Sequence, residues 1–310
     1  MGLFHEAINQ QAYLKMGLFG FQGSGKTFTA ARVAIGLYRY LESKKPVMFL
    51  DTETGSDFVA PRFRQAGITL FVSKTRNFID LCKAVDEAQQ VSDILIVDSI
   101  THFWRELVRS YKAKKKLPFL RIQDWGPLKD EWQQYSDRYV NSLIHFIMCG
   151  RAANIFQDVE DDGDDDTKKS NWKAVKVGTK MAAETEMGYE PSLLVEMTKV
   201  YLQDGGKYTR RANVIKDRFA VIDSREYDFS SEDAEDFTFK SFLPHIELLN
   251  LGGVHLGVDT SGSSESLWSD QGKARAEEER RRKILLEEIQ GMMVERWPGQ
   301  SADDKKAKVK

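Results

Sequence analysis

Short apolar segments alternate with longer amphipathic segments along most of this chain. Continuous apolar runs, bounded by glycine or polar residues, indicate strands at residues 13–20, 46–50, 68–72 and 94–97. Residues 26–41 and 77–90 repeat apolar side chains near positions i, i+3, i+4 and i+7, which is typical of amphipathic helices. Because strands that are apolar at consecutive positions are buried on both faces, the pattern predicts an α/β fold with a mostly parallel sheet between two layers of helices.

The alternation ends in an antiparallel pair. Two further helical stretches and an apolar strand precede it, at residues 103–115, 123–139 and 143–149. Residues 193–202 and 208–216 are then strand-like, and Asp204-Gly205-Gly206 between them has the composition of a hairpin turn. We therefore expect one folded core over residues 13–250 that closes with a late β-hairpin.

Other segments lack the apolar periodicity of the core. Residues 151–180 are polar, glycine-bearing and densely charged, which predicts a mobile loop within the core. Residues 273–296 are highly charged with apolar side chains along one side, which predicts a helix. Outside the core we expect an N-terminal segment, a Gly/Ser-rich linker, a C-terminal helix and a disordered tail, at residues 1–12, 257–270, 271–298 and 299–310.

Composition narrows the class of protein. Hydrophobic residues make up 41% and aromatic residues 11% of the chain, which is too much for a disordered protein. The formal net charge of −2 neither supports nor excludes a nucleic-acid partner, because phosphate binding depends on local clusters of cations. The first residues lack the pattern of a targeting signal, and the longest apolar runs are too short to span a bilayer. We expect a cytoplasmic protein with no membrane partner.

The strongest chemical signal is GFQGSGKT, which begins at Gly20 and matches the G-x-x-x-x-G-K-[ST] pattern between a predicted strand and a predicted helix. Its glycines let backbone N–H groups converge on phosphate oxygens at a helix N-terminus. Lys26 supplies a charge for the β- and γ-phosphates, and the Thr27 hydroxyl suits Mg²⁺. The motif predicts binding of ATP and Mg²⁺ by Gly20, Gly23, Ser24, Gly25, Lys26, Thr27 and Phe28.

Two carboxylates follow apolar strands and are expected at the same edge of the sheet as this loop. Asp98 ends the run DILIVD and would hold Mg²⁺ with Thr27, although many strands end in an aspartate of structural role only. Glu53 in FLDTE would orient or deprotonate the attacking water, and the alternative is an exposed loop glutamate. A small-molecule kinase fits less well, because Glu53 suits activation of water better than recognition of a phosphoryl acceptor.

The motifs GFQGSGKT, FLDTE and ILIVDS, in this order, resemble the ATPase core of RecA-like proteins. CGRA, VGTK and VIKDR, at residues 149–152, 177–180 and 214–218, are most similar to phage-encoded RecA-like ATPases of single-strand annealing and recombination. The resemblance spans residues 14–249. It places such a protein in the cytoplasm of a bacterial host.

The resemblance also implies a catalytic arrangement. Glu53 would be the catalytic carboxylate, acting with Lys26, and Lys216 and Arg218 would reach into the ATP site of a neighbouring subunit. ATP would then be hydrolysed at the interfaces of an oligomer or filament that binds single-stranded DNA. The alternative for Lys216 and Arg218 is an exposed hairpin end.

A basic segment with aromatic residues is the candidate for nucleic-acid binding. Residues 105–121 contain seven lysines and arginines against the single acid Glu106, with Tyr111, Phe119 and Trp125 within or beside them. Cations along a backbone and exposed rings for stacking suit single-stranded DNA, whereas the simpler interpretation is a solvated helix face. With two lysines from residues 151–180, the candidates are Arg109, Lys112, Lys114, Lys115, Lys116, Arg121, Lys176 and Lys180.

The predicted loop at residues 151–180 leaves more than one interpretation open. Arg151, at its start, could sense the γ-phosphate and couple the nucleotide state to the loop. The acidic run at residues 158–166 could compete with DNA for the basic half of the loop, or could be an insertion that points away from it. A different function also remains open, a nucleotide-dependent switch that docks a protein partner through the C-terminal helix without DNA.

Overall fold

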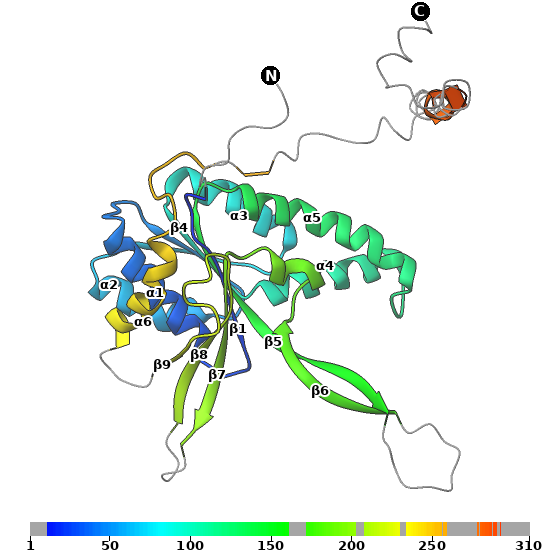
Figure 1. Cartoon of the computed structure of the whole chain (residues 1–310). Helices are drawn as coiled ribbons and strands as arrows, with labels where there is room; N and C mark the ends of the chain where they lie inside the picture. Colours follow the sequence, from blue (N-terminus) through cyan, green and yellow to red (C-terminus); the bar gives the residue numbers. More distant parts are fainter. Residues whose placement is uncertain are drawn as a thin grey trace, which may run out of the picture. The chain divides into compact units, whose positions relative to one another are not determined.

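The computed structural model describes residues 11–160, 172–202, 208–229, 234–255, 257–258, 278, 280–286, 288–289 and 292. The chain divides into two compact units, Met1–Val258 and Asp259–Lys310. The first unit contains the sheet (Figure 1), and all of the candidate site residues fall within its residue range. In the described part of the second unit, residues 280–286 and 288–289 are helical, within the range predicted for the C-terminal helix.

The described strands of the first unit form one nine-stranded sheet in the order β3-β2-β4-β5-β1-β7-β8-β9, with β6 paired to β5. Their bounds are β1 (Lys15–Gly20), β2 (Val47–Asp51), β3 (Leu70–Lys74), β4 (Ile94–Asp98), β5 (His145–Glu160), β6 (Trp172–Met181), β7 (Leu193–Tyr201), β8 (Tyr208–Asp217) and β9 (Glu226–Asp228). All pairings from β3 to β7 are parallel, and β8 and β9 continue the sheet in antiparallel fashion. The predicted fold class, including the late hairpin of β7 and β8, is confirmed.

Helices cover both faces of the sheet (Figure 1). One layer contains α1 (Lys26–Tyr40), α2 (Gly55–Gln65) and α6 (Ala234–Ile246), and the other contains α3 (Phe78–Val91), α4 (Ile100–Lys115) and α5 (Trp125–Asn141). Two 3₁₀ turns, η1 (Ile122–Asp124) and η2 (Thr185–Tyr189), lie in the connections. None of the described helices is long and apolar enough to cross a membrane.

Strand β4 shows why the central strands must be apolar at every position. Successive side chains of a strand point to opposite faces. Ile94 and Ile96 therefore pack in the core beneath α1 and α2, while Leu95 and Val97 pack in the core beneath α3, α4 and α5. The continuous run that ends at Asp98 is thus explained by two cores, one on each side of the sheet.

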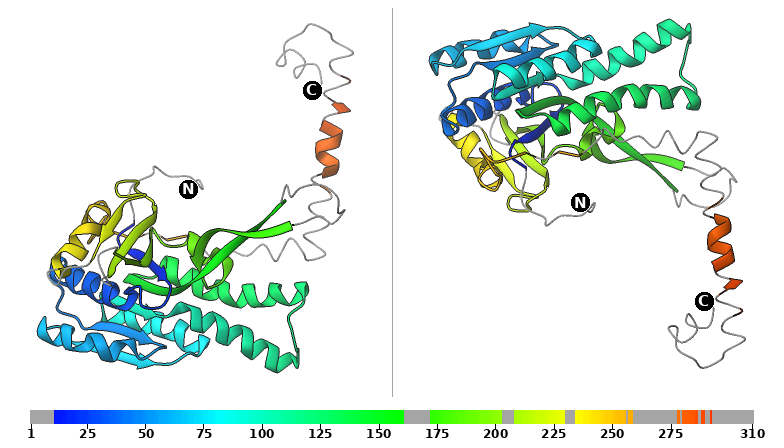
Figure 2. Two further views of the ribbon diagram at one scale, coloured as in Figure 1. Left: turned by 90° about the horizontal axis from the view of Figure 1, so that it is seen from below. Right: turned by 90° about the horizontal axis from the view of Figure 1, so that it is seen from above.

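The prediction of a mobile loop over residues 151–180 is wrong for the described part of that range. Strand β5 continues to Glu160, and β6 returns antiparallel to it from Trp172, so that Ala153 faces Lys180 and Phe156 faces Lys176. The β5–β6 hairpin extends away from the body of the sheet (Figure 2). Most of its side chains are exposed, so the segment lacks the apolar alternation that identifies a strand in a sequence. Hydrogen bonds between the backbones of β5 and β6 stabilise the hairpin instead. The acidic residues 161–166 lie outside the described residues.

Two further differences concern the edges of the fold. Strand β3 was expected to be buried, but it is the edge strand, and Phe71 and Val72 are 54% and 41% exposed. Helix α6 was not predicted from the sequence, and Pro244 within it weakened the helical signal. Its Phe239, Phe242 and Ile246 complete the core beneath α1. The N-terminal residues 1–10, most of the linker and the tail at 299–310 lie outside the described part of the chain.

Candidate functional site

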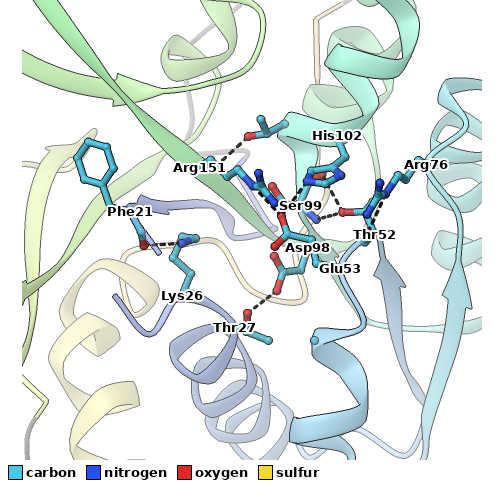
Figure 3. A network of polar contacts seen from close by, with 12 residues as sticks. Phe21, Lys26, Thr27, Thr52, Glu53, Arg76, Asp98, Ser99, His102 and Arg151 are labelled. Carbon is cyan, nitrogen blue, oxygen red and sulfur yellow. Dashed lines mark hydrogen bonds and ion pairs between the residues drawn. The ribbon is translucent and has the colours of Figure 1, made fainter. Parts of the chain in front are cut away.

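Four of the candidate site residues, Lys26, Glu53, Asp98 and Arg151, gather at the carboxyl edge of the central parallel strands (Figure 3). Strand β1 ends at Gly20, which is in register with Arg151 of β5. The neighbouring strands β2 and β4 end in register at Asp51 and Asp98. Because parallel strands end at one edge, the loop after β1, the turn after β2 and the last residue of β4 meet there, as the sequence predicted.

The loop between β1 and α1, the P-loop, has the backbone that its glycines allow. Gly23 and Gly25 have φ values of 72° and 94°, in the left-handed region that other residues avoid. Gly25 is the N-cap of α1 and provides no side-chain cap, so the first N–H groups of the helix suit an anion. Lys26 Nζ donates to the backbone oxygens of Gly20 and Phe21, at 2.9 and 3.0 Å. The loop is therefore shaped for phosphate, with the lysine folded across it.

Thr27 and Asp98 form the oxygen pair that suits a magnesium ion. Thr27 Oγ1 donates to Asp98 Oδ2 at 2.5 Å, and the two side chains come from α1 and β4. Asp98 is 3% exposed, and burial raises the pKa of its carboxyl to about 6, against the opposing effect of the Thr27 hydrogen bond. A hydroxyl and a carboxylate are hard ligands, so these residues fit Mg²⁺, which would neutralise charge on bound phosphates.

Glu53 lies at the same edge between two basic side chains. Its Oε1 accepts a hydrogen bond from Arg151 Nε at 3.0 Å and lies 3.0 Å from His102 Nε2 (Figure 3). Burial raises the pKa of the Glu53 carboxyl, but the hydrogen bond and charge of Arg151, with His102 and Lys26, outweigh burial and leave the pKa below its usual value. Burial lowers the pKa of His102. The carboxylate is thus ionised and held in place, as a residue that orients water requires.

Two supporting residues of this site were not identified from the sequence. Asp51, which is buried, accepts hydrogen bonds from the backbone N–H groups of Glu53 and Ser56, at 2.8 and 2.9 Å, and so shapes the turn that carries Glu53. His102 is on the first turn of α4, next to Thr101, whose hydroxyl accepts from the backbone N–H of Arg151 at 2.9 Å. The only available signal was position: Asp51 precedes Glu53 by two residues, and His102 follows the Asp98 strand.

A family model described as AAA domain matches residues 12–217, which include the P-loop, Glu53, Asp98 and the whole parallel part of the sheet. The chain belongs to the AAA domain family. No curated protein matches the sequence. Membership of this family supports a P-loop ATPase, and the predicted P-loop residues lie within the matched range.

The remaining nucleotide-site candidates lie around the P-loop of this AAA domain. The Arg62 guanidinium lies 5.0 Å from the centroid of the Phe28 ring, so a half-exposed ring and a cation from α2 flank the start of α1. Lys176, predicted to bind nucleic acid, lies on β6 with its Nζ 5.7 Å from the centroid of the Phe21 ring. The β5–β6 hairpin therefore contacts the P-loop directly.

Lys216 and Arg218 are not brought to the P-loop of their own chain. Both donate to the backbone oxygen of Tyr189, at 2.5 and 2.8 Å. Ala212 of β8 pairs with the residue of β7 that in turn pairs with Gly20. Lys216 lies four residues further along β8, and each residue of a strand adds about 3.3 Å, so Lys216 is well separated from the P-loop. Burial, together with Arg218, lowers the pKa of Lys216 to about 8. Their role at a neighbouring subunit stays a prediction.

Some of the predicted nucleic-acid residues line one open cleft. Its volume is about 520 Å³, and its lining combines side chains of α4, the start of α5 and β6. The lining residues are Trp104, Arg105, Val108, Arg109, Lys112, Trp125, Ala153, Lys180, Ala182 and Ala183. Lys114, Lys115, Lys116 and Arg121 lie at or beyond the end of α4 and do not line the cleft.

Proposed function

We propose that this AAA-domain ATPase binds single-stranded DNA and hydrolyses ATP in response to it, as an oligomer or filament. The proposal extends the resemblance to RecA-like ATPases of recombination and single-strand annealing. The observation that carries it is the cleft between α4 and the β5–β6 hairpin, which we name the tryptophan cleft.

The tryptophan cleft combines rings with cations. Trp104 and Trp125 are stacked, with centroids 6.3 Å apart and an interplanar angle of 26°, and Trp125 is 41% exposed. Arg109 and Lys112 of α4 and Lys180 of β6 line the same space. Exposed ring faces stack on unpaired bases, and cations beside them neutralise phosphates, so the lining favours a single strand over a duplex, whose bases already stack on one another.

The cleft is connected to the ATPase site through β5. Ala153 lines the cleft and is two residues from Arg151, which holds Glu53. Single-stranded DNA bound in the cleft would contact β5 at Ala153 and the paired strand β6. Such contacts would shift Arg151, which lies two residues away on β5. This connection supports hydrolysis that responds to DNA. The positions of Lys216 and Arg218, away from their own P-loop, support assembly in which they complete a neighbour's site.

The test is ATP hydrolysis by the purified protein with and without a long single-stranded DNA, at low and at moderate salt, with Lys26→Ala as the blank. We expect stimulation by DNA that fades as salt rises, because phosphate contacts release counterions. Duplex DNA of the same length is the matched control and should stimulate less. Hydrolysis that is abolished by Lys26→Ala but is indifferent to single-stranded DNA would overturn the proposal.

A second candidate function is a nucleotide-dependent switch that docks a protein partner through the C-terminal helix. The supporting observation is the exposure of apolar side chains within the described part of that helix, with Ile284, Leu285 and Leu286 at 55%, 56% and 50%. Indifference of hydrolysis to DNA, together with loss of partner binding on Leu285→Asp, would favour this alternative.

A further inference from the structure

Two cations of the β7–β8 hairpin, Arg210 and Lys199, lie beside the P-loop of their own chain. Strand β7 pairs with β1 up to Gly20 and then continues past the end of β1, where Lys199 faces Arg210 of β8. This cross-strand pair is therefore level with the P-loop. Neither residue belongs to a motif that identifies the site in the sequence.

Arg210 packs against the residue that begins α1. A methyl group in place of the Gly25 hydrogen would lie 2.4 Å from Arg210 Cδ and 3.0 Å from its Nε, so the arginine occupies the space that any side chain at position 25 would need. Lys199 approaches the same loop at Gly23, where the corresponding distance to its Cδ is 4.0 Å. The hairpin thus covers the P-loop with the stems of two basic side chains.

The polar ends of these two side chains have few hydrogen-bond partners within the described residues. Arg210 Nε is buried and has no hydrogen-bond partner there, and its terminal nitrogen reaches the Tyr208 hydroxyl only at 3.5 Å. Lys199 Nζ lies 3.9 Å from the centroid of the Tyr208 ring. A buried N–H without an acceptor is costly, so its retention beside an anion-binding loop points to an acceptor that the bound ligand supplies.

The adjacent residue shows a different arrangement. Arg211, one position along β8, pairs with Glu226 at 3.4 Å and with Asp228 at 3.2 Å on β9. No described carboxylate forms an ion pair with Arg210 or Lys199. Of two successive arginines, then, Arg211 is neutralised at the sheet edge, whereas Arg210 lies with its stem against Gly25 and its guanidinium 5.3 Å from the centroid of the Tyr208 ring.

We propose that Arg210, assisted by Lys199, binds the polyphosphate of the nucleotide held by the P-loop of the same chain. Lys26 and the N-terminus of α1 hold the phosphates from one side, and the β7–β8 hairpin closes on them from the other. The inference does not depend on DNA binding. It adds two nucleotide-binding residues in cis, whereas Lys216 and Arg218, at the other end of β8, are predicted to act at a neighbouring subunit.

The test is the affinity for Mg-ATP, and for a non-hydrolysable analogue, measured by calorimetry on the wild type, Arg210→Ala, Arg210→Lys and Arg211→Ala. A hydrogen bond to a charged group contributes about 1.5–3 kcal/mol, so Arg210→Ala should weaken binding about 10- to 100-fold. Arg210→Lys should recover part of the affinity, and Arg211→Ala should bind like the wild type. The thermal midpoint without nucleotide should not fall in Arg210→Ala, because the variant loses an unsatisfied donor.

Three results would overturn the inference. The first is unchanged affinity in Arg210→Ala while Lys26→Ala no longer binds, an outcome that leaves nucleotide binding itself intact. The second is equal weakening by Arg211→Ala, which would mean that the hairpin acts only through its stability. The third is recovery of binding when Arg210→Ala is mixed with Lys26→Ala, because rescue by a second subunit requires an arginine that acts in trans.

Discussion

Arg151 Nε donates a hydrogen bond to Glu53 Oε1 at 3.0 Å, and this contact joins the β5–β6 hairpin to the turn that follows β2. Removing the guanidinium should raise the pKa of Glu53, since Arg151 is the main influence that lowers it against the effect of burial. For Arg151→Ala we expect kcat to fall about 10- to 100-fold, less than the roughly 100- to 10,000-fold contribution of a general acid–base group itself, because Glu53 remains in place. The acid limb of the kcat–pH profile should move to higher pH. An unmoved limb in the variant would show that Glu53 is not the group that titrates.

Asp98 should determine the magnesium dependence of nucleotide binding. Asp98→Asn keeps the shape of the side chain and its contact with Thr27 but removes the charge that suits Mg²⁺. ATP should bind the wild type more tightly with Mg²⁺ than with EDTA, and the variant should lose that difference. Asp93→Asn, at the other end of β4, is the matched control, because Asp93 pairs with Lys45 away from the site. A magnesium effect that persists in Asp98→Asn would contradict the assignment.

Lys216→Ala should abolish hydrolysis and leave nucleotide binding by single chains nearly intact, because Lys216 lies away from its own P-loop. Hydrolysis should return in part when Lys216→Ala is mixed with Lys26→Ala, since each variant supplies what the other lacks. Turnover rates of the separate and mixed proteins give the answer. Normal turnover by Lys216→Ala alone would exclude the role in trans.

The tryptophan cleft predicts a difference between neighbouring residues of one helix. Trp125→Ala should weaken binding of single-stranded DNA by about 1–3 kcal/mol, the usual contribution of a stacking ring. Lys112→Ala should weaken binding and reduce its salt dependence, because Lys112 lines the cleft. Lys115→Ala, on the same helix but outside the cleft, should have a smaller effect. Fluorescence titration of a labelled strand at several salt concentrations measures all three, and equal effects of Lys112 and Lys115 would argue for a diffuse basic face.

Lys15 should make the stability of the fold depend on alkaline pH. Its ammonium is buried and donates to Ser142 O, Ser142 Oγ and Ile144 O, at 2.8, 2.6 and 3.1 Å. Burial lowers the pKa of Lys15 from 10.5 to about 7. Above pH 7 the unfolded chain therefore binds more protons than the folded one, so the free energy of unfolding rises with pH, by about 2 kcal/mol between pH 7 and pH 9.

Urea unfolding of the wild type and of Lys15→Met at pH 7 and pH 9 measures this contribution. The rise should be smaller by about 2 kcal/mol in Lys15→Met, where the lowered pKa of Lys216 still contributes, and should persist in full in Lys45→Met, whose lysine is largely exposed. A wild type that is equally stable at both values of pH would show that the buried ammonium keeps its ordinary pKa through its three acceptors.

The nucleotide-binding part of the site was predictable because its signals are local. The P-loop is one contiguous segment, and Asp98 and Glu53 are each defined by the strand that precedes them. Once the strands are parallel, their carboxyl ends must meet at one edge, so these residues come together without any knowledge of side-chain packing. The same reasoning supplied the parallel part of the sheet and four of the helices that cover it, because strands buried on both faces and amphipathic helices carry periodic apolar patterns.

The sequence by itself therefore determined that this protein has a parallel sheet with a phosphate-binding loop and two carboxylates at one edge. Only the tertiary structure decided that residues 151–160 and 172–180 form a hairpin, that Arg151 holds Glu53, and that Arg210 covers Gly25. The tryptophan cleft likewise exists only because α4, α5 and β6 converge. The physical reason is that exposed strands and single long polar side chains leave no periodic signal, and their partners are set by strand register and helix packing between residues far apart in the chain.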